Sequence, residues 1–201
     1  MQHSLFHSDT KNLLPFQGET FLYPNFFTRE KSDFYFQQLA ETLAWKQEPI
    51  RMFGKLVMQP RLTALYGDPD RPYGYSGISM VPLDWTDDLV EMRKAIEEFT
   101  GVRFTHVLCN LYRDGQDSMG WHRDNEAVLG KNPSIASMTF GATRMFQLRH
   151  YETKGNKIDI PLTHGSLLMM TGESQHQWEH QIPKTKKNLG PRINLTFRKL
   201  L

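Results

Sequence analysis

Two stretches in the first half of the chain place apolar residues at helical spacing. In Arg29–Leu43, apolar residues recur every three or four positions after a candidate N-cap at Thr28. A second apolar stripe runs between Thr86 and Gly101, with two aspartates in its first turn and the glycine as a C-terminal stop. The pattern predicts two amphipathic helices, each of which must bury its apolar stripe against a flat partner.

That partner is predicted by the second half of the chain, where the periodicity changes. Short runs of strand-forming residues are separated by Gly, Pro and Asn, at Phe104–Arg113, Ser134–Phe140, Met145–His150, Lys157–Leu162, Ser166–Met170 and Arg192–Arg198. This spacing is typical of a β-sandwich or barrel, so the expected fold class is α+β, mainly β. The segment Pro60–Gly77 is rich in turn residues and is expected to be irregular.

Length and composition narrow the class of protein. A chain of 201 residues with 39% hydrophobic residues is the size of one domain and can bury a core. It has no apolar run of 18 residues, and Met1–Asn12 lacks the basic and apolar regions of a signal peptide. The single cysteine, Cys109, fits a reducing compartment. We therefore expect a cytoplasmic protein, or a nuclear one in a eukaryote, that acts as a monomer away from membranes.

The charge is unevenly distributed. The formal net charge is only +2, yet from residue 180 to the end there are basic residues and no acidic ones. Local positive charge suits a polyanion or a bound dicarboxylate. For Lys184, Lys186 and Lys187, the alternative to an anion-binding role is a solvated surface loop. The basic residues are Lys184, Lys186, Lys187, Arg192, Arg198 and Lys199.

A candidate metal site lies just beyond the run that ends at Arg113. His122 and Asp124 are two residues apart, and on an extended segment such side chains point to the same side. The spacing alone is weak evidence, because His7–Asp9 and His150–Glu152 match it too. A third ligand would come from the later histidines, which are His150, His164, His176 and His180. The last of these is the best placed, because a second signature follows it.

That signature is a strand with one polar face. In Arg192–Arg198, strict alternation places two arginines, an asparagine and a threonine on one side and three apolar residues on the other. A half-solvated strand is one interpretation. The other is a cradle for a small dianion, because guanidinium groups bind carboxylates bidentately. Asn110 and Tyr112 end an earlier run beside the metal candidate. Two histidines, a carboxylate and a dianion cradle are the components of a facial-triad Fe(II) site with an organic-acid cosubstrate.

In order and spacing these motifs resemble the AlkB family of 2-oxoglutarate- and Fe(II)-dependent nucleic-acid dealkylases, from about residue 60 to the end. The motifs are Asn110-x-Tyr112, His122-x-Asp124, Ser137-x-Thr139-Phe140-Gly141-Ala142-x-Arg144, His180 and Arg192-x-Asn194-x-Thr196-x-Arg198. The resemblance implies a double-stranded β-helix (jelly roll) with flanking N-terminal helices. It implies a single dioxygenase domain over 1–201, with a nucleotide-recognition lid at about 45–80 and the catalytic core at about 103–201.

The resemblance also implies roles for individual residues. His122, Asp124 and His180 would bind Fe(II), and Arg198 would act with them in catalysis. The 2-oxoglutarate site would be lined by Asn110, Tyr112, Arg192, Asn194, Thr196 and Arg198. Arg192 and Tyr112 would hold the distal carboxylate of 2-oxoglutarate. Arg198 and Asn110 would lie nearer the carboxylate that chelates iron.

The lid region resembles that of the duplex-repairing members of the family. Phe53, Gly54 and Lys55 match a hairpin whose apolar finger can replace a flipped base in the stack, although Phe53 could instead be a core residue. The residues that match the base pocket are Tyr66, Tyr73, Tyr75 and Ser76, and those expected to hold phosphates are Arg51, Lys55 and Arg61.

One position departs from the family pattern. Asn125 stands where members commonly have an acidic residue that contacts the base, and Glu126 is expected to substitute for it. A methylated adenine or cytosine ring is cationic, so a neutral amide should recognise it less strongly. The preferred lesion is therefore open.

The implied activity is oxidative demethylation of N-alkylated bases in DNA, such as 1-methyladenine and 3-methylcytosine. It couples 2-oxoglutarate decarboxylation, with Fe(II) and O2, to methyl hydroxylation and formaldehyde release, which is direct reversal DNA repair. The implied partner is alkylated DNA, with RNA as a further partner. Two alternatives stay open. One is an oxygenase of the same fold acting on RNA, protein or a small molecule, and the other is a non-catalytic metal-binding jelly roll.

Overall fold

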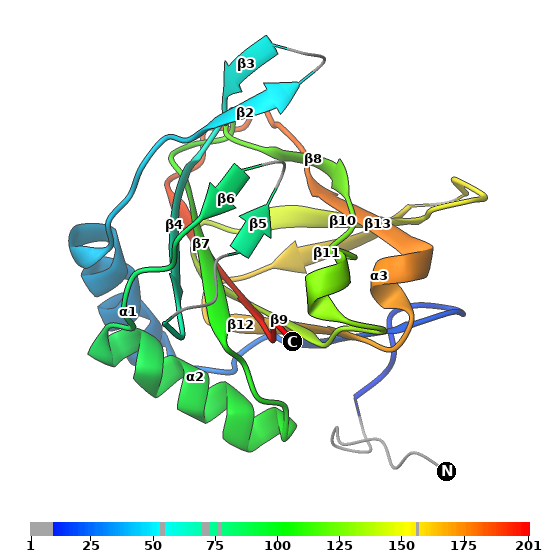
Figure 1. Cartoon of the computed structure of the whole chain (residues 1–201), viewed down its shortest axis with the longest axis horizontal. Coiled ribbons are helices and arrows are strands. Elements are labelled where there is room, and N and C mark those ends of the chain that lie inside the picture. The colour runs from blue at the N-terminus through cyan, green and yellow to red at the C-terminus, as the bar shows by residue number, and fades with distance from the viewer. Residues whose placement is uncertain (1–9, 53–54, 70–72, 76–77, 156) are drawn as a thin grey trace.

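The chain folds around two facing antiparallel β-sheets (Figure 1). The structure, a computed structural model, describes residues 10–52, 55–69, 73–75, 78–155 and 157–201. The larger sheet has six strands in the order β1-β12-β9-β14-β7-β4, and the smaller has four in the order β11-β10-β13-β8. This arrangement is a jelly roll, and it confirms the predicted fold class. The strands are β1 (Glu19–Tyr23), β4 (Leu62–Gly67), β7 (His106–Tyr112), β8 (Met119–His122), β9 (Ile135–Gly141), β10 (Arg144–His150), β11 (Ile158–Leu162), β12 (Ser166–Thr171), β13 (Trp178–Ile182) and β14 (Arg192–Arg198).

Both predicted helices are present, and their caps explain their limits. Helix α1 (Arg29–Thr42) begins after Thr28, whose hydroxyl accepts a backbone hydrogen bond from the first turn. Helix α2 (Asp87–Thr100) begins after Thr86 in the same way and ends at Gly101, which has a left-handed φ of 69°. Among the described residues, no helix is both long enough and apolar enough to cross a membrane. Two short helices connect strands, η1 (Ala127–Leu129) and α3 (Ser174–Gln177).

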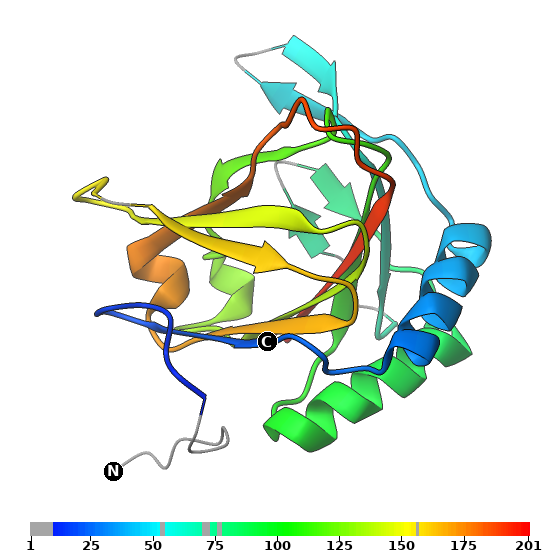
Figure 2. The same ribbon diagram turned by 180° about the vertical axis from the view of Figure 1, so that it is seen from behind.

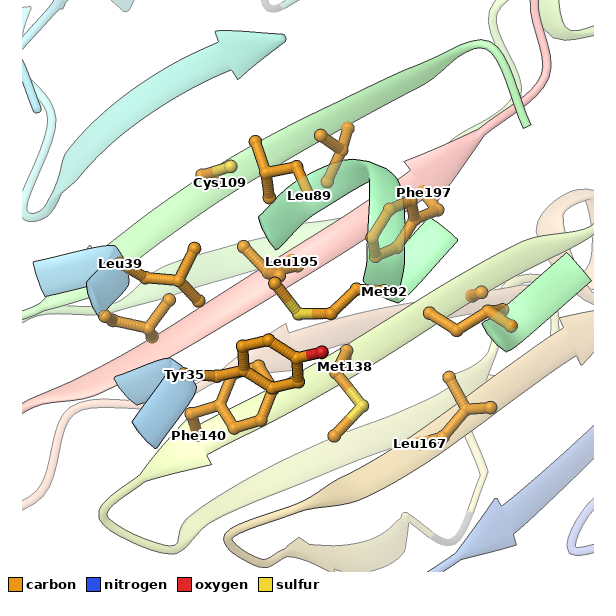
Figure 3. Packing of buried hydrophobic residues seen from close by; sticks show 14 of the residues in the cluster. Tyr35, Leu39, Leu89, Met92, Cys109, Met138, Phe140, Leu167, Leu195 and Phe197 are labelled. Atoms are coloured by element: carbon orange, nitrogen blue, oxygen red, sulfur yellow. The ribbon is translucent and has the colours of Figure 1, made fainter. Parts of the chain in front are cut away.

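The two long helices cover the outer face of the six-stranded sheet (Figure 2). Figure 3 shows their apolar stripes against the sheet, with Leu39 and Met92 beside Leu195. Burying a large apolar side chain contributes about 1.5–3 kcal/mol, so this layer is a main source of stability. Fully buried members of the cluster include Tyr35, Leu39, Leu89, Met92, Ile96, Cys109, Met138, Phe140, Leu167, Leu195 and Phe197.

Strand β14 lies at the centre of the six-stranded sheet, and all its residues are buried. Its apolar residues, such as Leu195 and Phe197, face the helices. Its polar residues, such as Asn194 and Arg198, face the four-stranded sheet, although they too are less than 9% exposed. The half-solvated interpretation of this strand is therefore excluded, and its polar face must be matched by protein groups or by a ligand.

A second apolar cluster fills the space between the two sheets. Leu168 and Met170 of β12 lie in it, opposite Phe146 and Leu148 of β10, while the alternate residues of β12 face the helices. Strands β12 and β14 are thus both buried on two faces, but only β14 has an inner face made of polar groups. The polar groups of β14 run along the whole inner face of the strand, from Arg192 at its start to Arg198 at its end.

The segment Pro60–Gly77 is more regular than predicted. It contains β4, which pairs along its whole length with β7, and β5 (Tyr73–Tyr75), which pairs with β6 (Ile78–Met80). Pairing with β7 makes Leu62–Gly67 a strand, although the surrounding segment is rich in turn residues. A further hairpin consists of β2 (Pro49–Met52) and β3 (Lys55–Met58), and stands apart from both main sheets (Figure 1).

Candidate metal and cosubstrate site

The structure brings His122, Asp124 and His180 together between the two sheets. His122 ends β8, and its backbone is paired in register with that of His180 on β13. Asp124 follows two residues later, and its amide nitrogen donates to Gln175 Oε1 at 3.0 Å. Each of the three side chains offers a ligand atom, and these atoms lie within 4.8 Å of one another. Neither strand β8 nor β13 was among the runs predicted from the sequence.

Both histidines are in the form that binds a metal. The Gly120 carbonyl can only accept, so Nδ1 of His122 carries the proton that it donates over 2.9 Å. Nε2 of His122 is then unprotonated, and it lies 3.9 Å from Asp124 Oδ1. Burial lowers the pKa of His122, against the attraction of Asp124. Burial and the neighbouring His122 lower the pKa of His180 to about 3, so both rings are neutral at pH 7.

Asp124 supplies the negative charge. Burial alone would raise its pKa, but the Arg198 guanidinium and the two histidines lower it to about 2. Arg198 Nη2 donates to Asp124 Oδ2 at 2.8 Å, which leaves Oδ1 facing the histidines. Asp124 Oδ1 and His180 Nδ1 are buried and have no hydrogen-bond partner. Two neutral imidazoles, one carboxylate and an orphaned carboxylate oxygen 3.9 Å from His122 Nε2 fit a divalent metal.

A pocket that is open to solvent adjoins these residues. It lies between the sheets, with Asn110 and Asn194 from the six-stranded sheet and Phe146 and Ile182 from the four-stranded sheet among its lining residues. Phe146 of β10 stacks on the His180 ring, with the ring centroids 5.1 Å apart. The residues that line the pocket are Leu108, Asn110, Tyr112, Met119, His122, Asp124, Ser137, Phe146, Met170, His180, Gln181, Ile182, Asn194, Thr196 and Arg198.

Arg192 lies behind Tyr112 as a buried cation. Its side chain is 1% exposed, and its guanidinium carbon is 5.2 Å from the centroid of the Tyr112 ring. Nη2 donates to Thr139 Oγ1 at 2.9 Å, whereas Nε and Nη1 have no hydrogen-bond partner. Burial lowers the pKa of Arg192 to about 10, against an opposing effect of Tyr112, so the group is still charged at pH 7. A buried cation with donors to spare fits an anionic ligand entering from the pocket.

Two residues expected to contact the nucleic acid are placed elsewhere. Arg61 is only 3% exposed and donates to Asn110, so it is not a surface phosphate contact. Tyr66 is buried in the helix-side core, and its hydroxyl accepts from the Ala44 amide. Both predictions were wrong because a basic or aromatic residue type in a turn-rich segment does not reveal which way a strand residue points.

The remaining substrate-binding predictions stay untested by geometry. Phe53, Gly54 and Ser76 lie outside the described residues, and Tyr73 and Tyr75 are described only as backbone of β5. Lys55 is exposed at the start of β3, which fits a contact with an external partner. Asn125 is exposed beside the triad, and Glu126 is partly buried at the N-cap of η1.

Sequence reasoning missed several residues of the site, among them Gln175 and Phe146. Gln175 comes from α3, a helix of four residues that has no periodic signal. Phe146 could have been found, because it alternates with Leu148 on a predicted strand and so shares its inward face.

Comparison with known proteins finds one matching family model and several proteins of similar sequence. A family model described as the 2OG-Fe(II) oxygenase superfamily matches residues 19–198. The chain is 45% identical to "Alpha-ketoglutarate-dependent dioxygenase alkB homolog 3" of Bos taurus and 44% identical to that of Homo sapiens, over 186 residues in each case. These matches cover 88% of the chain, which spans 64% of each relative's length. It is 39% identical to human "DNA oxidative demethylase ALKBH2" over 189 residues, covering 89% of the chain and 72% of that protein.

The chain belongs to the AlkB family of 2OG-Fe(II) oxygenases. The solved structure of OsALKBH1 shares its fold, with a TM-score of 0.60 over 90% of this chain and 97% of that one, at 16% identity. AlkB membership implies Fe(II), 2-oxoglutarate and O2 as cofactor and cosubstrates. The donor set at His122, Asp124 and His180 fits the ion, and Arg192 fits the distal carboxylate of the acid.

Proposed function

We propose that this AlkB-family chain is an Fe(II)- and 2-oxoglutarate-dependent dioxygenase that removes N-linked methyl groups from bases in DNA, such as 1-methyladenine and 3-methylcytosine. One observation carries the proposal. The buried metal-ligand triad lines a pocket, and a buried, partly unpartnered guanidinium, that of Arg192, lies behind Tyr112, which lines the same pocket. A structural metal site would need only the triad, so the second feature favours an organic dianion as cosubstrate. A relative with 39% identity is named a DNA oxidative demethylase, which supports the substrate class.

His122, Asp124 and His180 would hold Fe(II), and the 2-oxoglutarate site would be formed by Asn110, Tyr112, Arg192, Asn194, Thr196 and Arg198. When bound, Fe(II) and 2-oxoglutarate activate O2 for hydroxylation of the N-methyl group, with release of succinate, CO2 and formaldehyde. The protein's contribution is positional. Arg198 donates to one oxygen of Asp124 at 2.8 Å, and the other oxygen would remain available to hold the ion.

Other residues control water and orientation. Apolar side chains on the pocket wall, including Met119 and Ile182, exclude water from the reacting methyl group. The Gly120 carbonyl fixes the tautomer of His122, so Nε2 stays available as a ligand. In this scheme no side chain acts as a nucleophile. The protein holds the ion and the acid and places the methyl group within reach of them.

For the nucleic acid, we propose that residues 45–80 form a recognition lid over a core at 103–201 within a single, monomeric dioxygenase domain. The exposed Lys55 on the β2–β3 hairpin and the exposed Asn125 beside the triad support contacts with an external polymer. Phe53 and Gly54 would form the finger tip with Lys55. The other contacts to the base would come from Tyr73, Tyr75, Ser76, Asn125 and Glu126.

The test is an anaerobic loading of the protein with Fe(II) and 2-oxoglutarate, followed by O2 and a methylated oligonucleotide. Formaldehyde and unmethylated base are expected in equal amounts, from DNA containing 1-methyladenine or 3-methylcytosine. Parallel reactions use methylated RNA and an unmethylated DNA, and the Asp124→Ala variant serves as the inactive control. Succinate release without formaldehyde from any methylated polymer would show an oxygenase with another substrate. No response of melting temperature to either metal or 2-oxoglutarate would remove the oxygenase assignment itself.

A further inference from the structure

Arg61 is a buried arginine without an assigned role, and it lies behind the pocket. It precedes β4, and its side chain is 3% exposed. Nε donates to Asn110 Oδ1 at 2.8 Å, and Nη1 donates to the Ser118 carbonyl at 3.3 Å. Ser118 immediately precedes β8, the strand that ends at His122. Arg61 therefore joins a pocket residue of β7 to the strand that carries a metal ligand.

The contact decides which end of the Asn110 amide faces the pocket. An arginine can only donate, so the end of the amide near Arg61 must be the oxygen. The nitrogen of Asn110 then points away from Arg61, and its hydrogen bond to the Leu108 carbonyl is 3.5 Å long, at the outer limit. Asn110 lines the pocket and is 6% exposed. Its amide nitrogen is therefore a buried donor with only a weak partner.

The asparagine on the neighbouring strand, Asn194, differs because its amide nitrogen has strong hydrogen-bond partners. Asn194 pairs in register with Asn110. Its nitrogen donates to Ser137 Oγ at 2.9 Å and to the Met138 carbonyl at 3.0 Å, so both donors of that amide are used. Two asparagines thus line one pocket, but only Asn110 has a donor to offer. The difference between them is Arg61, which occupies the acceptor of one and not of the other.

We propose that Arg61 is a positioning residue for the cosubstrate, which holds Asn110 with its amide nitrogen toward a carboxylate of the bound acid. The inference rests on the proposed function, because it takes 2-oxoglutarate as the acid. Both protein partners of Arg61 are neutral, an amide oxygen and a carbonyl. Its positive charge is therefore not cancelled by them and adds to the attraction of the pocket for a dianion. Without Arg61 the amide would be free to rotate and present its oxygen, which repels a carboxylate.

The experiment measures 2-oxoglutarate affinity rather than turnover. Calorimetric titration of 2-oxoglutarate into Mn(II)-loaded protein, without O2, compares the unmodified chain with Arg61→Met, Asn110→Ala and the double variant. Loss of one charge-assisted hydrogen bond predicts that Arg61→Met raises the Kd roughly tenfold or more. Because Arg61 acts mainly through Asn110, the double variant should bind only slightly more weakly than Asn110→Ala alone, by the small direct effect of the lost Arg61 charge. Arg61→Lys, which keeps the charge and a donor, should restore part of the affinity.

Two further variants make the test independent of folding problems. Asn110→Asp keeps an acceptor for Arg61 but replaces the amide nitrogen by an oxygen, so it should fold and still raise the Kd at least as much as Asn110→Ala. The matched control is Arg93→Met. It removes a half-buried arginine that pairs with Asp68 and lines no part of the pocket, and it should leave the Kd unchanged.

Several results would overturn the inference. It fails if Asn110→Asp binds 2-oxoglutarate like the unmodified chain, or if the effects of Arg61→Met and Asn110→Ala simply add. It also fails if Arg61→Met leaves the Kd unchanged while weakening oligonucleotide binding and lowering its salt dependence, which is the behaviour of a phosphate contact. Failure of the unmodified chain to bind 2-oxoglutarate would instead overturn the proposed function, and the inference with it.

Discussion

Replacing Arg192 by methionine should have opposite effects on the free protein and on the ligand-bound protein. The guanidinium is 1% exposed, and burial lowers its pKa from the ordinary value to about 10. That change corresponds to about 3 kcal/mol of destabilisation of the charged form, fully present at neutral pH because pH 7 is below both the folded and the unfolded pKa. The substitution relieves this penalty but loses the bond to Thr139, which contributes about 1 kcal/mol.

The free protein should therefore become more stable by about 1–2 kcal/mol when Arg192 is replaced. The ligand effect should go the other way. A ligand at 100 times its Kd stabilises the folded state by about 2.7 kcal/mol, and this gain should disappear when the cation that holds the distal carboxylate is gone. The assay is urea unfolding of both proteins, without metal and 2-oxoglutarate and then with Mn(II) and excess 2-oxoglutarate.

Arg144 provides the matched control. It is also buried, at 3% exposed, but its guanidinium donates to three backbone carbonyls, those of Asp114, Asp117 and Pro183. Arg144→Met leaves these acceptors unsatisfied and should destabilise the free protein by about 3 kcal/mol or more. The reasoning is refuted if Arg192→Met loses as much stability as Arg144→Met, or if it retains the stabilisation by 2-oxoglutarate.

Three other substitutions test separate features. Asp124→Asn should abolish the rise of melting temperature caused by Fe(II) under nitrogen, and a retained rise would show that the triad is not the metal site. Gly141→Ala should destabilise by roughly 1–3 kcal/mol in urea unfolding, because the residue has a φ of +85° and a Cβ there would lie 2.4 Å from the Pro191 carbonyl oxygen; an unchanged midpoint would contradict this. Burial opposes ionisation of Asp117, but its hydrogen bonds to Arg113 lower the pKa of the carboxyl group. The ionised Asp117 therefore stabilises the folded protein above the ordinary carboxyl pKa of 3.8, and this stabilisation is lost as the pH falls through the lower pKa of the folded state. Asp117→Asn should accordingly be less stable than the unmodified chain at pH 7, with the difference shrinking below pH 3.8.

Local sequence patterns were sufficient to predict the helices and strands whose limits depend on residues close together in the chain. Thr86 and Gly101 set the limits of α2 through contacts inside the helix itself, so the sequence predicted both ends. Strand β14 was predicted from its alternation of polar and apolar residues. In contrast, β8 and β13 were missed. They are short, mixed in composition, and held by pairing with each other and with β10.

The sequence by itself determined the kinds of chemical group that this AlkB-family protein has and their order along the chain, because residue type and spacing are fixed by covalent structure. It could not determine which way each group points. Arg61 and Arg192 are the same residue type, and one was expected at a phosphate and the other at a dicarboxylate. Only the packing of two sheets buries both, turning one toward the Asn110 oxygen and leaving the other with two free donors. Burial and pairing depend on contacts between residues far apart in the chain, and these contacts form only when the two sheets pack together.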